Sequence, residues 1–362
     1  REVEMRINVV GAGIMGLSTV LALVEAGHRV TIFEQGPIPN PLGSSVDSHR
    51  LIRHPYGAMG GYSRMINPAY TAWDRVWAAI GQTLYSPTGT IVLARDILTW
   101  AEESLADMEA LGISTQRLNS AQLRERMPML STTGVELAAW IDSGGVLLAE
   151  KIVAAMARHL LQRGATLRTH TTVTAIEPER NAVVLEDGER IRAEATVVSA
   201  GPWVHQLQHG LKKRVIPSRQ LVLYLKPPDK FQQTWADAPM ILDIHKSGGI
   251  YAVPPVQGTG LKVGEHAFTL RGKPDNNREA GEAECLALFE HCRDRFLDMD
   301  SYNIERGKVC FYSVEPSERF IIEGDKNLVL MSGFSGHGFK FGALMGRLAA
   351  GLITGKVEAD SI

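Results

Sequence analysis

The start of the chain contains three mainly hydrophobic blocks, separated by short segments that contain glycine or polar residues. A β-branched run at residues 7–10 predicts a strand, an apolar segment that continues to about residue 26 predicts a helix, and residues 29–33 predict a second strand. Residues 7–24 are nearly uncharged, so a membrane span is an alternative. The glycine turn within this segment and the acid at Glu25 favour a buried strand–helix–strand unit.

The same patterns predict elements over the rest of the chain. Helices are expected at residues 63–80, 98–111, 120–129, 147–163, 279–297 and 339–352, and strands at residues 86–93, 166–177, 182–185, 194–201, 221–225, 249–253 and 328–331. We expect Ser120 to cap its helix. We expect the last helix to face a sheet with Leu344, Leu348 and Leu352. Residues 36–61 form a long polar loop rich in Gly and Pro, which is typical of a functional loop.

Strands that alternate with helices, interrupted by strand-rich stretches, predict an α/β fold. We expect a Rossmann-type dinucleotide-binding domain assembled from residues 1–80, 140–215 and 305–362. A substrate domain of α+β type, built on an antiparallel sheet from residues 81–139 and 216–304, would be inserted into it. Because residue 1 is not Met, residues 1–4 carry no weight here.

The turn after the first strand carries a G-x-G-x-x-G motif made of Gly11, Gly13 and Gly16. Glycine is needed where a Cβ would collide with a pyrophosphate or with the neighbouring strand, and the following helix offers free N–H groups to phosphates. Glu34 lies 23 positions after Gly11, where a carboxylate can accept hydrogen bonds from a ribose. These features favour FAD or NAD over NADP. An ordinary strand–helix unit with a tight turn would leave Glu34 without a role.

Composition narrows the protein class. The chain has 362 residues, 44% hydrophobic and 22% charged, which suits a soluble protein of about two domains. A net charge of −2 does not favour a nucleic acid or a membrane surface as partner. Cys285, Cys292 and Cys310 show neither metal-ligand spacing nor a disulfide framework, so we expect no metal site. This cysteine usage, with no evident secretory signal, favours the cytoplasm. Cys285 and Cys292 are seven apart on a predicted helix, which indicates core packing.

Five motifs together resemble the monomeric sarcosine oxidase and N-methyltryptophan oxidase group of the D-amino-acid-oxidase-like flavoproteins. They are the glycine motif with Glu34, R-x-x-R-H-x-Y-G at residues 50–57, GLKVGEH at 260–266, C-x-Y at 310–312 and GFSGHGFK at 333–340. The resemblance spans essentially the whole chain. It implies FAD as the cofactor of the Rossmann-type domain and a monomeric enzyme.

The resemblance also implies which residues bind FAD. Cys310 lies where the family forms a thioether to the flavin, although a buried small hydrophobe is the usual fate of a free Cys. Arg50 would place a cation at the flavin face, and His337 lies in the glycine turn beside the flavin. The implied cofactor-binding residues are Gly11, Gly13, Gly16, Glu34, Ser44, Ser45, Arg50, Cys310, Gly336, His337, Gly338 and Lys340.

Catalytic roles are carried over in the same way. Lys262 matches a lysine above the flavin that promotes reaction with O2, because a fixed cation stabilises developing superoxide. His266 matches an active-site histidine that shapes the environment of the substrate amine. Arg53 and Lys340 match the pair that holds a substrate carboxylate. Tyr251 and Tyr312 match aromatic positions of the pocket, and as strand tyrosines they could equally be core residues.

One position departs from the family pattern. Where the family usually has a histidine beside the flavin, this chain has Ser45, Val46 and Asp47, and His49 is shifted. That histidine belongs to the electropositive surroundings of the flavin. The departure therefore bears on the covalent link through Cys310 and on substrate choice.

These observations predict an FAD-dependent amine oxidase. We expect oxidation of the C–N bond of a secondary or N-methyl amino acid to an imine, which water hydrolyses to a carbonyl product and an amine, with O2 as acceptor and hydrogen peroxide as product. Alternatives are a primary or cyclic amino-acid oxidase or dehydrogenase of the glycine, proline or pipecolate type, and an NAD-dependent Rossmann dehydrogenase. A non-catalytic flavin-binding protein is a further alternative.

Overall fold

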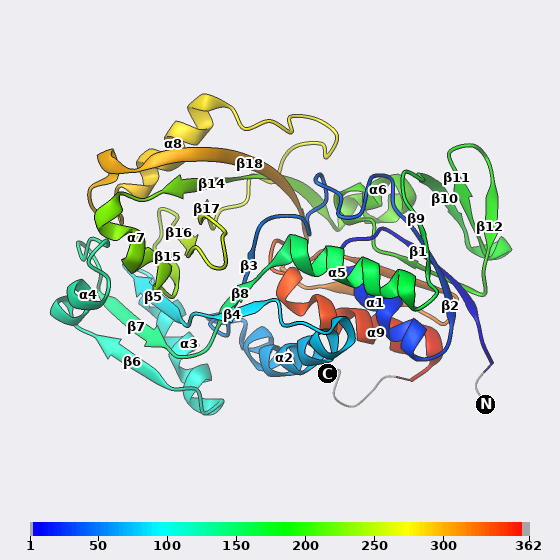
Figure 1. Ribbon diagram of the computed structural model, residues 1–362, viewed down its shortest axis with the longest axis horizontal. Coiled ribbons are helices and arrows are strands. Elements are labelled where there is room, and N and C mark those ends of the chain that lie inside the picture. Colours follow the sequence, from blue (N-terminus) through cyan, green and yellow to red (C-terminus); the bar gives the residue numbers. More distant parts are fainter. Residues whose placement is uncertain (1–2, 357–362) are drawn as a thin grey trace.

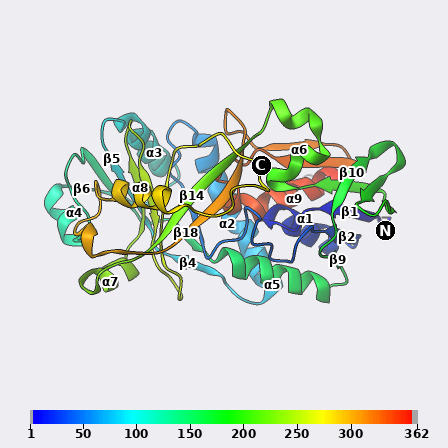
Figure 2. The same cartoon turned by 90° about the horizontal axis from the view of Figure 1, so that it is seen from above.

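A computed structural model describes residues 3–356 of the chain. The elements lie in two groups along the long axis of the molecule, each built around one large sheet (Figure 1). Two long strands, β14 (Ile216–Lys226) and β18 (Asn303–Val314), run from one group toward the other, as the view from above also shows (Figure 2). Polar side chains from distant parts of the sequence meet between the two groups.

The first group is built on a six-stranded sheet of order β19-β20-β13-β1-β2-β9. All neighbouring strands are parallel except β19 and β20. This is the predicted Rossmann-type arrangement. The strands are β1 Arg6–Val10, β2 Arg29–Phe33, β9 Thr166–Arg168, β13 Ala195–Val198, β19 Ile321–Gly324 and β20 Leu328–Ser332. A small antiparallel sheet lies beside it, formed by β10 Val173–Glu177, β11 Ala182–Leu185 and β12 Arg190–Arg192.

Helices α1 (Ile14–Glu25), α5 (Ala149–Gln162) and α9 (Gly342–Thr354) pack by this sheet, and α1 contacts both of the others. The close contact between α1 and α9 depends on small residues. A Cβ on Gly346 would lie 2.4 Å from the backbone carbonyl carbon of Ser18. Our expectation for the last helix was therefore only partly right. Leu344 is buried, but Leu348 and Leu352 remain half-buried because small residues form much of the packed face.

The second group is built on an eight-stranded sheet of order β18-β14-β17-β16-β15-β5-β7-β6. This sheet is mixed rather than purely antiparallel, because β5 and β15 pair in parallel. Its strands are β5 Thr90–Ala94, β6 Thr115–Leu118, β7 Leu137–Ile141, β14 Ile216–Lys226, β15 Met240–Ile244, β16 Ile250–Val253, β17 Leu261–Glu265 and β18 Asn303–Val314. The helices of this group are α3 Leu98–Ala110, α4 Ser120–Arg126, α7 Asp229–Ala236 and α8 Glu282–Cys292. Cys285 and Cys292 are buried in its core, as the sequence predicts.

Three local expectations differ from the structure. The strand expected at residues 166–177 is divided into β9 and β10, which lie in different sheets. Asn119, not Ser120, caps α4, because its side chain accepts hydrogen bonds from the backbone N–H groups of Ala121 and Gln122. The strand expected at residues 86–93 is divided into β4 and β5, with Gly89 between them in a left-handed conformation (φ +75°).

The remaining elements connect the two groups. Helix α2 spans Gly60–Ile80 with Pro68 inside it, and a three-stranded sheet joins β3 Arg50–Ile52, β8 Gly145–Leu147 and β4 Tyr85–Pro87. Short elements are α6 Val204–Leu207 and 3-10 turns at Pro178–Arg180, Gly201–Trp203, His209–Lys213, Met299–Ser301 and Phe339–Phe341. Within residues 3–356, no helix combines the length and apolar character needed to cross a membrane.

We retain as a proposal the division into a discontinuous cofactor domain and a substrate domain. Strand β18 extends across the proposed boundary at residues 304 and 305, because it pairs with β14 from Asn303 to Val314. The last residues of the proposed cofactor domain, 357–362, lie outside the described part of the chain.

Candidate dinucleotide and substrate site

The glycine turn requires two of its three glycines for its own geometry. Gly11 has φ +98°, and a Cβ there would lie 2.3 Å from the carbonyl oxygen of Ser199. A Cβ on Gly16 would lie 1.9 Å from the carbonyl oxygen of Gly11. Any larger residue would therefore push β1, α1 and the turn after β13 apart. Gly13 faces Ser45, whose hydroxyl accepts a hydrogen bond from the N–H of Ile14 at 2.9 Å.

Glu34 is held rigidly at the end of β2. Its carboxylate accepts hydrogen bonds from the N–H of Ala12 (3.0 Å), the N–H of Gly36 (3.1 Å) and the side-chain amide of Asn40 (2.8 Å). It therefore fixes the glycine turn as well as facing the cavity beside it. The sequence pattern pointed only to a ribose.

This cavity, which we call the first cavity, contains about 1290 Å³ of space free of protein atoms, part of it open to solvent. It extends from Glu34 past the glycine turn to Arg50 and Tyr312. The glycine-lined wall, the N-terminus of α1 and the carboxylate at one end suit an extended dinucleotide. Of the expected cofactor residues, those that line it are Gly11, Gly13, Glu34, Ser44, Ser45, Arg50, Gly336 and Gly338. Val173 and Gln206 also line it, and no motif marks them in the sequence.

A second cavity adjoins the first. Arg50, Tyr312, Ser335, Gly336 and Phe339 line both cavities. Gly336 is required at this junction, because it has φ +78° and a Cβ would lie 2.4 Å from the ring of Tyr312. The second cavity brings together all the expected catalytic residues, Arg50, Arg53, Tyr251, Lys262, His266, Tyr312 and Lys340. It also holds three residues expected at the cofactor, Cys310, His337 and Lys340, which do not line the first cavity.

Arg53 and Lys340 are cations whose hydrogen bonds go to neutral groups. Arg53 donates to the carbonyl of Pro55 and lies over the ring of Tyr56, 4.4 Å from its centroid. Lys340 donates to the Tyr56 hydroxyl at 3.1 Å and to the His337 carbonyl at 3.3 Å. Burial, together with the charge of Arg53, lowers the pKa of Lys340 well below its ordinary value. An anion between these groups would relieve that penalty.

His266, which is half-buried, and His337, which is buried, are two imidazoles of the second cavity. Burial, and then the charge of Arg53, lowers the pKa of His266 to about 4. Its Nε2 has no hydrogen-bond partner within residues 3–356, and its ring lies 5.7 Å from that of Tyr251. His337 interacts with the Tyr56 hydroxyl at 3.2 Å, and burial also holds its pKa well below the ordinary value. Both rings are therefore neutral at neutral pH.

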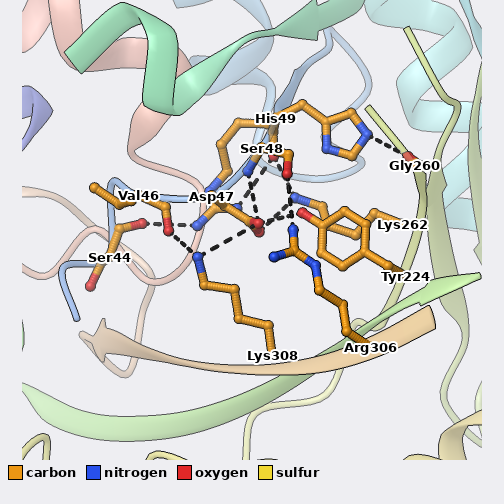
Figure 3. Close-up of polar contacts among 11 residues, drawn as sticks. Ser44, Val46, Asp47, Ser48, His49, Tyr224, Gly260, Lys262, Arg306 and Lys308 are labelled. Atoms are coloured by element: carbon orange, nitrogen blue, oxygen red, sulfur yellow. Dashed lines mark hydrogen bonds and ion pairs between the residues drawn. The ribbon is translucent and has the colours of Figure 1, made fainter. Parts of the chain in front are cut away.

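Lys262 points into a buried cluster centred on Asp47, the residue in the segment where the family pattern has its histidine (Figure 3). Its Nζ donates to the Asp47 carboxylate at 3.2 Å and to the carbonyl of His49 at 2.5 Å. Arg50 forms a second ion pair with Asp47 at 2.5 Å, and Lys308 lies 3.7 Å from it. The sequence marks Asp47 as a departure from the family but gives it no role.

Cys310 lies on β18 and is 6% exposed. Burial raises the pKa of its thiol, whereas Arg50, Lys262 and Lys308 act to lower it. The thiol thus combines a protonated resting state with a strongly electropositive neighbourhood.

Comparison with known proteins agrees with a dinucleotide-binding site. A family model described as FAD dependent oxidoreductase matches residues 6–352. The chain is 28% identical to monomeric sarcosine oxidase of Bacillus sp. (strain B-0618), covering 97% of this chain and 93% of that one. It is 27% identical to N-methyl-L-tryptophan oxidase of Yersinia pestis (strain Pestoides F), covering 94% and 93%. The structure of L-proline dehydrogenase from P. horikoshii superimposes with a TM-score of 0.83 at 20% identity, over 98% and 95% of the two chains, which shows a shared fold.

Proposed function

The chain belongs to the FAD-dependent oxidoreductase family, and we propose that it oxidises the C–N bond of a secondary or N-methyl amino acid with O2 as the electron acceptor. Membership in this family removes the NAD-dependent dehydrogenase that the glycine motif alone allowed. One observation carries the proposal. Lys340 is buried and Arg53 half-buried, both have neutral hydrogen-bond partners, and they line a cavity that shares Arg50 and Tyr312 with the dinucleotide cavity.

The first part of the proposal concerns the substrate carboxylate. The planar fork of Arg53 and the ammonium of Lys340 can bind a carboxylate together. When the anion enters, it raises the pKa of Lys340 toward its ordinary value, because an opposite charge favours the protonated form. An amine that lacks a carboxylate would not supply this opposite charge and would therefore bind more weakly.

The second part concerns the amine. When bound, FAD supplies the redox chemistry, taking a hydride equivalent from the substrate and passing two electrons to O2. The substrate amine must be deprotonated to be oxidised, and His266 is a neutral imidazole whose Nε2 is free within the described residues to bind it. Lys262 supplies a fixed positive charge, which stabilises the superoxide that forms when O2 accepts the first electron. Tyr251 and Tyr312 limit the space around the reacting carbon.

The third part concerns Cys310. We propose that its sulfur forms a thioether to FAD, a bond that replaces one S–H and one C–H bond. Transfer of the two electrons and two protons to O2 as hydrogen peroxide balances the step. Flavin fluorescence that remains with the polypeptide after denaturation would support the thioether to Cys310. Complete release of the flavin on denaturation would contradict it.

The proposed activity is tested by anaerobic mixing. The purified protein is mixed with sarcosine, proline, pipecolate, glycine or larger N-methyl amino acids while the flavin absorbance is followed. We expect an N-methyl or secondary amino acid to bleach the flavin and its decarboxylated analogue to do so far more slowly. A flavin that bleaches only with glycine would replace the proposal with a primary-amine oxidase, and a flavin that no amino acid bleaches would remove amino-acid oxidation.

A further inference from the structure

We propose that Asp47 is a positioning residue for the oxygen reaction: its buried carboxylate is the shared counter-ion that holds Lys262 in place and keeps it positively charged. This inference rests on the proposed function, since it concerns the lysine assigned there to O2. Neither the family motifs nor the comparisons give Asp47 a role.

The carboxylate of Asp47 is completely enclosed by donors. The side chains of Asp47 and Lys262 are each 2% exposed, and their ion pair joins the loop before β3 to strand β17. Arg50 and Lys308 approach the same carboxylate, and the hydroxyl of Tyr224 on β14 donates to it. Figure 3 shows Lys262, Lys308 and Tyr224 converging on Asp47, and they come from β17, β18 and β14. Such a group cannot be solvated by water, so its charge depends on these partners.

A second layer of contacts fixes the cluster. Arg306 lies over the ring of Tyr224, 4.1 Å from its centroid, and donates to the Ser48 hydroxyl at 3.0 Å. Lys308 donates to the carbonyl of Val46 at 2.5 Å. Residues on both sides of Asp47 are therefore held by β18, which leaves the carboxylate little freedom to move away from Lys262.

The charges of the cluster explain why the lysine needs this partner. The groups that face Lys262 are Asp47 and His49 from the loop, Arg50 from the start of β3, Tyr224 from β14, and Cys310 from β18, with Lys308 beside Asp47. Burial and Arg50 lower the pKa of Lys262, whereas Asp47 raises it, and the result is a value of about 8. For Asp47 itself, burial would raise the pKa, but Lys262, Arg50 and Lys308 together hold it well below the ordinary range.

Asp47 does not neutralise the site, because one carboxylate faces three cations, Arg50, Lys262 and Lys308. Without it, their mutual repulsion would be relieved by the group that loses a proton most easily. A guanidinium does not deprotonate in proteins, whereas a buried lysine does. Lys262, the more deeply buried lysine, would thus become neutral near pH 7 and could no longer stabilise superoxide.

The first test measures the charge of Lys262 directly, without turnover. The holoenzyme is labelled with 13C at lysine Cε, and the Lys262 resonance is assigned by its loss in Lys262→Met. We expect a titration midpoint near 8 in the unchanged protein and a midpoint lower by about one to three pH units in Asp47→Asn. Equal midpoints would overturn the proposal.

A matched control is Asp243→Asn. Asp243 is also 2% exposed and pairs with the buried Arg295 at 3.0 Å, so this change leaves an equivalent unpaired cation beside β15, two strands away from Lys262 in the same sheet. We expect it to leave the Lys262 midpoint unchanged. A shift of the same size in this control would show that the effect follows general destabilisation, and would overturn the role of Asp47.

The second test follows reoxidation of the reduced enzyme by O2 in stopped flow between pH 6 and 10. In the unchanged protein the rate should fall as pH rises through the Lys262 midpoint, and in Asp47→Asn this fall should occur at lower pH, with a rate about tenfold lower at pH 7.5. In a Lys262→Met background, Asp47→Asn should cause no further loss. A full loss in that background would overturn the proposal.

If Asp47→Asn does not fold, Asp47→Ala purified in formate keeps the idea testable. Formate supplies an exchangeable carboxylate, so it should restore the midpoint and the reoxidation profile, whereas uncharged formamide should not. Equal action of both compounds would overturn the proposal. Failure of the proposed function is seen separately, because Lys262→Met would then reoxidise at the normal rate while the NMR shift in Asp47→Asn could still be present.

Discussion

The two adjoining cavities are built on different physical principles. The first cavity is shaped mainly by backbone, since Gly11, Gly13 and the N-terminus of α1 line it, and a Cβ on Gly11 or Gly16 would clash with the backbone that forms this turn. The second is shaped by charged and aromatic side chains from distant segments. Lys340 and Arg53 contact Tyr56, and Lys262 contacts Asp47. The first cavity is therefore sensitive to added atoms, and the second to lost charge.

This contrast has a thermodynamic basis. Close backbone packing is stabilised by many short-range contacts and depends little on pH or salt. Buried cations are held against a desolvation penalty, so each is stable only with its specific partners. We expect substitutions in the second cavity to change rates and pH profiles, and those in the first to change cofactor content and stability.

The largest effect is expected for Lys262→Met. Loss of the fixed charge should slow reoxidation by O2 about 10²–10³-fold, whereas reduction by substrate should change little. Stopped-flow measurement of the two half-reactions separates these rates. Lys226→Met, at the exposed end of β14, is the matched control and should behave as the unchanged protein. Equal slowing of both half-reactions would contradict an oxygen-specific role.

A smaller effect is expected for Lys340→Met. Loss of one charged group of the proposed carboxylate site should lower kcat/KM about 10–100-fold, in keeping with about 1.5–3 kcal/mol for a charged hydrogen bond. Steady-state kinetics with the amino acid and its decarboxylated analogue measure this. The variant should discriminate less between the two compounds, and the exposed Lys326→Met should not. Unchanged discrimination in Lys340→Met would remove it from the carboxylate site.

Gly16→Ala should have the smallest effect on the catalytic rates and the clearest effect on the first cavity. The added Cβ would lie 1.9 Å from the Gly11 carbonyl oxygen, and relieving this clash should destabilise the fold by about 1–3 kcal/mol and lower the FAD content. Denaturant unfolding and the flavin-to-protein absorbance ratio measure both. Gly61→Ala, which has open space around it, is the control. A fully loaded variant of normal stability would contradict the steric argument.

The sequence predicted the first cavity more completely than the second for a physical reason. Gly11, Gly16 and Glu34 lie within one local unit, so their spacing already encodes their geometry. Strand β2 was predicted at its observed bounds, Arg29–Phe33. In the second cavity, the resemblance to a family supplied the residues, because no local pattern brings Arg53 next to Lys340.

The role of Asp47 could not be predicted from the sequence, because its lysine partners are brought to it only by the tertiary structure. Its partners Lys262 and Lys308 lie on β17 and β18, more than two hundred residues further along the chain, and pairing of these strands with β14 aligns them. A substitution relative to a family pattern marks a position, but only tertiary structure shows what surrounds it. The mixed pairing of β5 with β15 was missed likewise, since parallel partners leave no turn signal between them.

The Asp47 cluster also bears on the order in which the chain acquires its structure during synthesis. The loop that carries Asp47 leaves the ribosome long before Lys262 and Lys308 are translated, so in a nascent chain that ends before residue 308 its carboxylate has only some of its cations, at first Arg50 alone. The junction of the two cavities can therefore close only when translation is nearly complete. Ser335, Gly336 and Phe339, which line both cavities, are also among the last residues of the chain to be synthesised.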